Sequence, residues 1–233
     1  MFFDIITLFP EMFTGVFDAS ILKKAQQKKL ININLHNLRD WAKDKHKQVD
    51  DTPYGGGAGM VLKVDVMDRC LTDIVGAGHD LPVRNNSQQK TRKILLTPQG
   101  KTFNQSTARR LTKYDRLILI CGHYEGFDER IREHLVDEQI SLGNFVLTGG
   151  EIPAMSIVDA ISRLVPGVIK TESSSGESFS IRSNKKGRTP NLLEYPQYTK
   201  PAEYNGWKVP EILLSGHHEK VEKWRNSKLH RQE

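Results

Sequence analysis

Three short loops rich in small residues have the composition of a ligand-binding site. They are LLTPQG at 95–100, ICGHYEGFDER at 120–130 and SLGNFVLTGGEIPA at 141–154, and each is associated with a stretch typical of an apolar strand. An open α/β sheet binds its ligand at the carboxyl ends of its strands. Small residues there let backbone N–H and C=O groups surround a nucleoside that carries no phosphates. The three loops therefore predict one shared nucleoside site.

A fourth motif, PYGGGAGM at 53–60, follows Asp50 and Asp51. Its glycines permit left-handed backbone and a close approach to a ligand, so an anion or substrate loop is one interpretation. The string is not GxGxxG after a strand, and no GK[ST] follows it, so neither a dinucleotide fold nor a P-loop is supported. A loop that needs glycine only for its geometry is the open alternative.

The elements around these loops alternate between strands and helices. Strands are predicted at 2–8, 31–38, 93–97, 116–121 and 144–148, and helices at 20–29, 65–75, 104–112, 128–135 and 151–165. Alternation of this kind predicts an α/β domain with a mostly parallel sheet, in which the run LILIC at 117–121 is a buried central strand. We place this domain at residues 1–165.

The amino-acid composition changes after this domain. Residues 166–190 are rich in Ser, Gly and Lys, which predicts a flexible linker. Residues 191–233 contain aromatic residues among prolines and then a polar stretch from about 215 to 231, which predicts a small, mainly helical second domain.

Composition excludes several classes of protein. No apolar run approaches the roughly 18 residues of a membrane span, so we expect no membrane insertion. The two cysteines, Cys70 and Cys121, form no disulfide framework and lack metal-site spacing, which predicts a reducing, cytoplasmic location and no metal site. Lys and Arg number 34 against 28 Asp and Glu, a net charge of +6 that favours a polyanionic partner.

The chain as a whole resembles the bacterial tRNA (guanine-N1)-methyltransferase family of the SPOUT class. The resemblance runs in order from Met1 to about Arg225 through PYGGGAGM, LLTPQG, CGHYEGFDER, SLGNFVLTGGEIPA, VDAISRLVPGV, YPQYTKP and LLSGHHEKVEKWR. It implies that the sheet domain is tied in a deep trefoil knot, which most chains avoid. It also implies a homodimer with active sites at the subunit interface.

The resemblance further implies S-adenosyl-L-methionine as the methyl donor, bound by the three loops described above. The matching cofactor-binding positions are Leu96, Thr97, Pro98, Gly122, Tyr124, Ser141, Leu142, Gly143, Phe145, Leu147, Gly149, Gly150 and Pro153. No cluster of metal ligands is visible, although the chemistry of the family makes Mg²⁺ a possible cofactor.

The implied substrate is the guanine immediately 3′ of the tRNA anticodon, methylated at N1. Because N1 carries a proton, the reaction needs a base to remove it and a donor to hold the charge that develops on O6. The resemblance assigns the donor to Arg163 and a supporting carboxylate to Glu125. The base falls on Glu177, where the family has Asp in an Asp-Ser-Phe triplet, and we expect Glu177 to serve.

Substrate binding is assigned to Asp50 and Gly59, beside and within the glycine-rich loop, and to the basic run Lys185, Lys186 and Arg188, which we predict contacts tRNA phosphates. Two alternatives remain open. One is a SPOUT enzyme that modifies a different RNA, and the other is a catalytically impaired RNA-binding protein, for which the change at Glu177 is the supporting feature.

Overall fold

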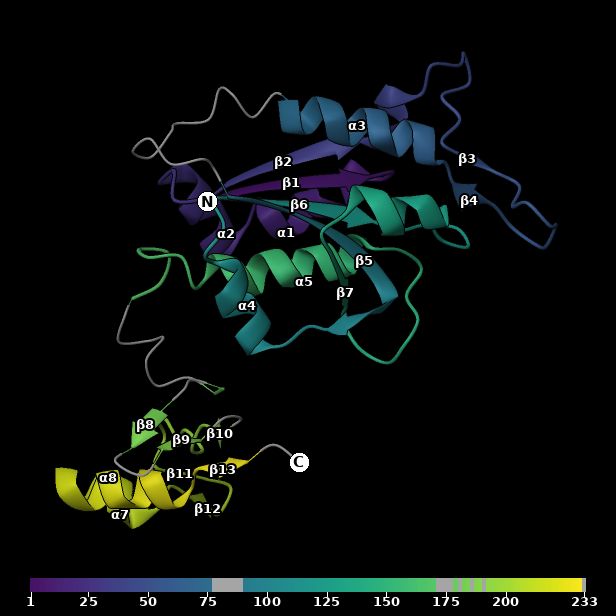
Figure 1. The fold of residues 1–233 in the computed structure, drawn as a ribbon. Coiled ribbons are helices and arrows are strands. Elements are labelled where there is room, and N and C mark those ends of the chain that lie inside the picture. The colour runs from purple at the N-terminus through teal and green to yellow at the C-terminus, as the bar shows by residue number, and fades with distance from the viewer. Residues whose placement is uncertain (77–89, 171–177, 180–181, 185–186, 190–191, 232–233) are drawn as a thin grey trace. The chain divides into compact units, whose positions relative to one another are not determined.

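The computed structural model describes residues 1–76, 90–170, 178–179, 182–184, 187–189 and 192–231 (Figure 1). Two compact units make up the chain, Met1–Ile169 and Lys170–Glu233. In the described ranges, no helix combines the length and the apolar character needed to cross a membrane.

The first unit is built on a five-stranded sheet in the order β2-β1-β6-β5-β7. Every pairing between neighbours in this sheet is parallel. The strands are β1 (Phe2–Thr7), β2 (Asn32–Asn37), β5 (Thr91–Thr102), β6 (Arg116–Cys121) and β7 (Glu138–Ser141). All residues of the central strand β6 are buried, as the apolar run at 117–121 predicted. The prediction of an α/β fold on a mostly parallel sheet is confirmed.

Helices cover both faces of this sheet. On one face lies α3 (Val64–Gly76), and on the other lie α1 (Thr14–Phe17), α2 (Ser20–Gln27), α4 (Gln105–Leu111) and α5 (Glu151–Ser162) (Figure 1). The alternation of side chains along β1 feeds two cores: Phe3 and Ile5 pack with Ile157 of α5, whereas Ile6 packs with Met67 of α3. Both faces of the sheet are therefore apolar and covered.

One strand prediction is wrong and a second is too short. Residues 144–148 form no strand; the last strand of the sheet is instead β7, at Glu138–Ser141. The strand predicted at 93–97 does not end there either, because β5 continues to Thr102. Its pairing with β7 shifts register between Leu96 and Lys101, which both pair with Ile140 of β7. The residues between them therefore form a bulge in β5. The helix predicted at 128–135 forms over 129–135, where Glu129 and Arg130 are α-helical and lead into the π-helical turn η4 (Ile131–Leu135).

Short elements join these layers. They are the helical turns η1 (Pro10–Phe13) and η2 (Leu38–Trp41) and the strand pair β3 (Asp50–Asp51) and β4 (Val61–Leu62), which brackets the glycine-rich loop. Helix α4 starts after Asn104, whose side-chain oxygen accepts a hydrogen bond from the backbone N–H of Thr107 at 3.0 Å and so caps the helix.

A buried ionic cluster ties three strands of the sheet together. Asp4 of β1 accepts hydrogen bonds from Arg116 Nε at 2.6 Å and Asn34 Nδ2 at 3.1 Å, and its other contact is His36 Nε2 at 2.7 Å. Burial alone would raise the pKa of Asp4, but the hydrogen bonds from His36, Arg116 and Asn34 lower it overall. The carboxylate is therefore held ionised inside the fold.

In the described part of the second unit, all helices and strands are short. They are the antiparallel pairs β8–β9 (Arg182–Asn184 and Gly187–Thr189), β10–β13 (Leu192–Leu193 and His230–Arg231) and β11–β12 (Glu203–Tyr204 and Trp207–Lys208), and the helices α7 (Glu211–Leu214) and α8 (His218–Ser227). The pair β8–β9 lies within the range that we predicted as a linker. The rest of that range includes 171–177, 180–181, 185–186 and 190, which lie outside the described residues.

Candidate functional site

A cavity of about 430 Å³ opens where the parallel strands end. Its walls come from the bulge of β5, the residues after β6 and the segment between β7 and α5, the three loops that the sequence singled out. Every residue that the resemblance assigns to the methyl donor lines this cavity. The size suits a nucleoside-type ligand, since small-molecule sites run from roughly 300 to 1,000 Å³.

Glycines let the backbone segments of this cavity approach closely. Gly150 donates its backbone N–H to the carbonyl oxygen of Gly122 at 2.9 Å. A Cβ on Gly150 would lie 2.6 Å from the Cα of Cys121, and one on Gly122 would lie 2.8 Å from the ring of Phe127. Neither position has room for a side chain, so the strand end and the start of α5 meet as bare backbone.

The floor beneath these glycines is polar and buried. Glu151, at 2% exposure, accepts a hydrogen bond from the Thr7 hydroxyl at 2.7 Å. Burial, and next the nearby charge of Glu151, raise the pKa of Cys121 well above its usual range. Cys121 is therefore a neutral thiol and not a nucleophile. Beside it, His123 packs against the rings of Phe9 and Tyr124, with centroid distances of 4.9 and 5.0 Å.

The glycine-rich loop is joined to the loop after β6. Glu125 donates its backbone N–H to Met60 O at 3.0 Å, and Leu62 donates to Gly126 O at 3.0 Å. A Cβ on Gly59, which has a φ of +81°, would lie 2.4 Å from the side chain of Glu125. Gly59 thus leaves the space that Glu125 occupies at the cavity wall, so the fourth motif packs against the wall, although none of residues 53–60 lines the cavity itself.

Few charged side chains line the cavity. They are Glu125, Glu129 and Arg132, and the guanidinium of Arg132 forms an ion pair with Glu129. Sequence reasoning did not single out Glu129 or Arg132, although Glu129 lies inside the motif ICGHYEGFDER. The lining carries a small excess of negative charge, which disfavours a phosphate and suits a ligand with positive charge.

The structure does not bring all the predicted catalytic residues to this cavity within one chain. Arg163 follows the last turn of α5, whereas Gly150 and Pro153 line the cavity at the first turn. Twelve residues of helix separate the two ends by about 18 Å. Glu177 lies outside the described residues.

The predicted substrate-binding residues lie in several places. Asp50 begins the strand pair that brackets the glycine-rich loop, where it is opposite Leu62. Arg188 is in β9, opposite Ser183, and Lys185 and Lys186 lie outside the described residues. Among the residues that the structure describes, no group of three His, Cys, Asp or Glu side chains is arranged to hold a metal ion.

Apolar side chains surround the mouth of the cavity. Phe145 is 54% exposed and Val146 is 86% exposed, and Tyr124 and Ile152 nearby are also exposed. Tyr124, Phe145 and Val146 themselves line the cavity. Exposed apolar side chains grouped around a functional site indicate a surface that another molecule covers.

An all-parallel α/β sheet with a nucleoside-sized cavity at its strand ends is the architecture in which α/β proteins bind nucleoside-type ligands. Comparison with known proteins makes the class specific. The whole chain, residues 1–233, matches the family tRNA (Guanine-1)-methyltransferase TrmD. The chain belongs to this family.

Known relatives are similar in sequence to this chain over most of their length. The chain is 52% identical over 225 residues to a protein of Ruminiclostridium cellulolyticum, covering 97% of this chain and 89% of the relative. It is 54% identical over 228 residues to one of Chloroflexus aggregans, covering 97% and 82%, and 50% identical over 223 residues to one of Brevibacillus brevis, covering 95% and 84%. Each of these relatives is named tRNA (guanine-N(1)-)-methyltransferase.

Proposed function

We propose that this tRNA (guanine-N1)-methyltransferase transfers the methyl group of S-adenosyl-L-methionine to N1 of the guanine immediately 3′ of the tRNA anticodon. The observation that carries the proposal is the cavity at the strand ends in a chain that belongs to the family from end to end. The family establishes the type of reaction, and the cavity supplies a place for the donor.

The cavity fits this donor in shape and charge. Close backbone approach at Gly122 and Gly150 offers N–H and C=O groups to an adenine edge, while Leu96, Leu142 and Phe145 offer apolar surface to its faces. Glu125, whose charge no lining cation neutralises as Arg132 does that of Glu129, favours a ligand that carries a sulfonium and an ammonium group. Bound there, S-adenosyl-L-methionine supplies an electrophilic methyl group.

The protein's part of the chemistry is to move one proton and hold one charge. Glu177 removes the proton from guanine N1, which makes the ring nitrogen nucleophilic. Arg163 donates hydrogen bonds to O6, where negative charge develops as the proton leaves. Glu125 supports this arrangement from the cavity wall, where Gly59 leaves space for it and where Asp50 and Gly59 contact the guanine.

The active form is a homodimer with each site at the subunit interface. Two features of one chain support this: Arg163 lies about 18 Å along α5 from the cavity-lining turn, and exposed apolar side chains such as Phe145 and Val146 surround the cavity. A second copy that covers this surface brings its own Arg163 to the reacting guanine. The same copy excludes water from the cavity.

The remaining parts of the proposal concern topology and tRNA binding. The first unit is tied in a trefoil knot, supported by backbone crossings so close that Gly100 and Gly150 have no room for a Cβ. Residues 191–233 form a small, mainly helical tRNA-binding domain, and Lys185, Lys186 and Arg188 in the preceding segment contact tRNA phosphates. Neutralising the three is expected to weaken tRNA binding and flatten its salt dependence. The enzyme acts in the cytoplasm, where Cys70 and Cys121 stay reduced.

Labelled methyl transfer tests the proposal. An unmodified tRNA with two successive guanines, the second immediately 3′ of the anticodon, is expected to accept label from S-adenosyl-L-methionine. The same tRNA with adenine at the target is expected to accept none. Binding of both tRNAs without methylation would instead favour a catalytically impaired RNA-binding protein, and methylation of both would favour a different target.

A further inference from the structure

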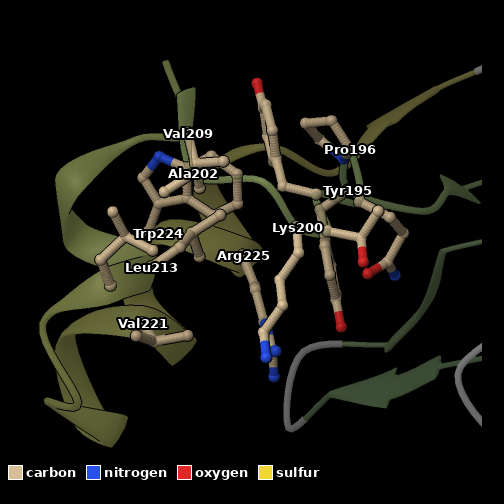
Figure 2. A pocket seen from close by; sticks show the side chains of 13 residues that line it. Tyr195, Pro196, Lys200, Ala202, Val209, Leu213, Val221, Trp224 and Arg225 are labelled. Carbon is tan, nitrogen blue, oxygen red and sulfur yellow. The ribbon is translucent and has the colours of Figure 1, made fainter. Parts of the chain in front are cut away.

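The second unit holds a cavity of its own, of about 310 Å³, which shares no lining residue with the cavity of the first unit. It lies between the segment 195–202 and the helices α7 and α8 (Figure 2). Trp224 of α8 lies among Ala202, Val209 and Leu213, which form the apolar side of the cavity (Figure 2). Every residue that lines this cavity is in the described part of the chain.

Aromatic rings form the second feature of this cavity. Tyr198 lies beside Trp224, with ring centroids 6.4 Å apart, and keeps 49% of its surface exposed. Tyr195 lies under the guanidinium of Arg225, whose central carbon is 5.0 Å from the ring centroid. An exposed aromatic face beside an apolar recess is how proteins stack an unpaired nucleobase, whatever its identity.

Cations form the third feature. The amine of Lys200 and the guanidinium of Arg225 extend in the same direction beside Tyr195 (Figure 2). No Asp or Glu is among the lining residues, and within the described ranges neither Lys200 nor Arg225 forms an ion pair. Because a ring and not a carboxylate positions Arg225, its N–H groups remain available to a phosphate.

We infer that this cavity binds one unpaired nucleotide of the tRNA, with the base stacked on Tyr198 and the adjoining phosphate held by Lys200 and Arg225. The inference rests on the proposed function, because it takes tRNA as the partner. A stacked base combined with a backbone phosphate matches the aromatic and cationic halves of the cavity, and a purely apolar ligand would leave the two cations unused.

The cavity is also connected to the segment that carries the proposed base. Tyr195 follows Glu194, whose carboxylate oxygen Oε1 accepts a hydrogen bond from Ser178 N at 3.0 Å. In return, Glu194 N donates to the Ser178 hydroxyl at 3.1 Å. Ser178 is the neighbour of Glu177 in the sequence. A nucleotide bound beside Tyr195 would therefore lie next to Glu194, the residue that holds Ser178 through two hydrogen bonds.

Binding of base-deleted tRNAs to the full chain tests this inference. The probes are an unmodified tRNA and a set of otherwise identical tRNAs, each lacking one base at an unpaired position. For the wild-type chain, one deletion is expected to weaken binding about tenfold, the loss of one stacked base. For Tyr198→Leu, the intact tRNA is expected to bind about tenfold more weakly, and that same deletion is expected to have no further effect.

Two further variants control the test. Tyr198→Phe keeps the aromatic face and is expected to bind as the wild type does. Tyr204→Ala removes an aromatic side chain that is 60% exposed in the same unit but outside the cavity, and is also expected to leave binding unchanged. Melting curves and circular dichroism of all three variants establish that each is folded.

The outcomes separate this inference from the proposed function. A wild-type chain that binds and methylates tRNA while Tyr198→Leu binds equally tightly overturns the inference alone. The inference is also overturned if Tyr204→Ala loses as much tRNA affinity as Tyr198→Leu does. It is overturned, too, if every base deletion weakens binding equally in the wild type and in Tyr198→Leu. Failure of the wild-type chain to bind tRNA at all overturns the proposed function together with it.

Discussion

The substitution Gly150→Ala should damage the methyl-donor site through a single added methyl group. The backbone of Gly150 has φ −83° and ψ −3°, which any residue adopts, so the variant carries no backbone strain. Its Cβ, however, would lie 2.6 Å from Cys121 Cα and 2.7 Å from Gly122 N, where ordinary contact begins near 3.4 Å. Strand β6 and helix α5 must therefore separate by about 0.8 Å.

Two effects follow from this separation. Overpacking of this kind lowers the free energy of unfolding by about 1–3 kcal/mol. A displacement close to 1 Å in the cavity wall is expected to raise the dissociation constant for S-adenosyl-L-methionine by about ten- to a hundredfold. Calorimetric titration of the donor and urea unfolding measure the two effects.

A matched control distinguishes the effect of the close contact at Gly150 from the effect of replacing a glycine by alanine. Gly15→Ala in α1 places its Cβ in open space, with no atom within 4 Å and no positive φ. We expect it to leave donor binding unchanged and to raise the free energy of unfolding by up to about 1 kcal/mol, since Ala is the better helix former. Wild-type donor affinity and stability in Gly150→Ala would refute the account of the cavity wall.

Three further predictions concern stability, the base and the dimer. The pKa of Asp4 is lower in the folded state than in the unfolded state, so ionised Asp4 stabilises the fold. This contribution to the free energy of unfolding is complete above the unfolded pKa near 3.9 and is lost as the pH falls through the lower folded pKa. Arg116→Met leaves Asp4 buried without its cation and should lower the free energy of unfolding by about 3–5 kcal/mol at pH 7. Urea midpoints at pH 7 and at a pH below about 3.9 check this, and a midpoint at pH 7 that Arg116→Met leaves unchanged would contradict it. Glu177→Gln should slow single-turnover methylation about 10²- to 10⁴-fold with donor affinity unchanged, and an unaltered rate would exclude Glu177 as the base. Inactive Glu125→Ala and Arg163→Ala proteins, unfolded and refolded together, should recover about a quarter of wild-type activity, since half of the dimers are hybrids with one intact site; no recovery would argue against a shared site.

The core of the fold could be predicted from the sequence because the local residue pattern and the burial in the structure favour the same elements. The run at 117–121 is apolar throughout and became the fully buried strand β6. Asn104 precedes a helical pattern and caps α4. In both places the preference of the residues themselves is the same as that of the tertiary structure.

The last strand of the sheet was not readable for the opposite reason. The segment 144–148 is rich in β-forming residues, but Phe145 and Val146 are exposed at the cavity mouth. The real strand, β7, is the unremarkable EQIS at 138–141, where Glu138 forms ion pairs with Arg92 of β5 and Arg110 of α4. Long-range pairing with β5 makes this segment a strand, and such pairing leaves no signal in a local window.

The site was readable in part. Strand ends of a parallel sheet gather at one edge, so the three loops at 95–100, 120–130 and 141–154 could be expected to form one cavity. The contact of Gly59 with Glu125 joins segments far apart in the chain, and no spacing rule predicts it.

The most direct test of the proposed reaction is to identify the methylated nucleoside. An unmodified tRNA is incubated with the enzyme and S-adenosyl-L-methionine, digested, and examined by mass spectrometry, with oligonucleotide mapping to place the product. The account predicts 1-methylguanosine at the nucleotide immediately 3′ of the anticodon and no other methylated nucleoside. A methyl group on another atom of guanine, or on another nucleotide, would contradict it.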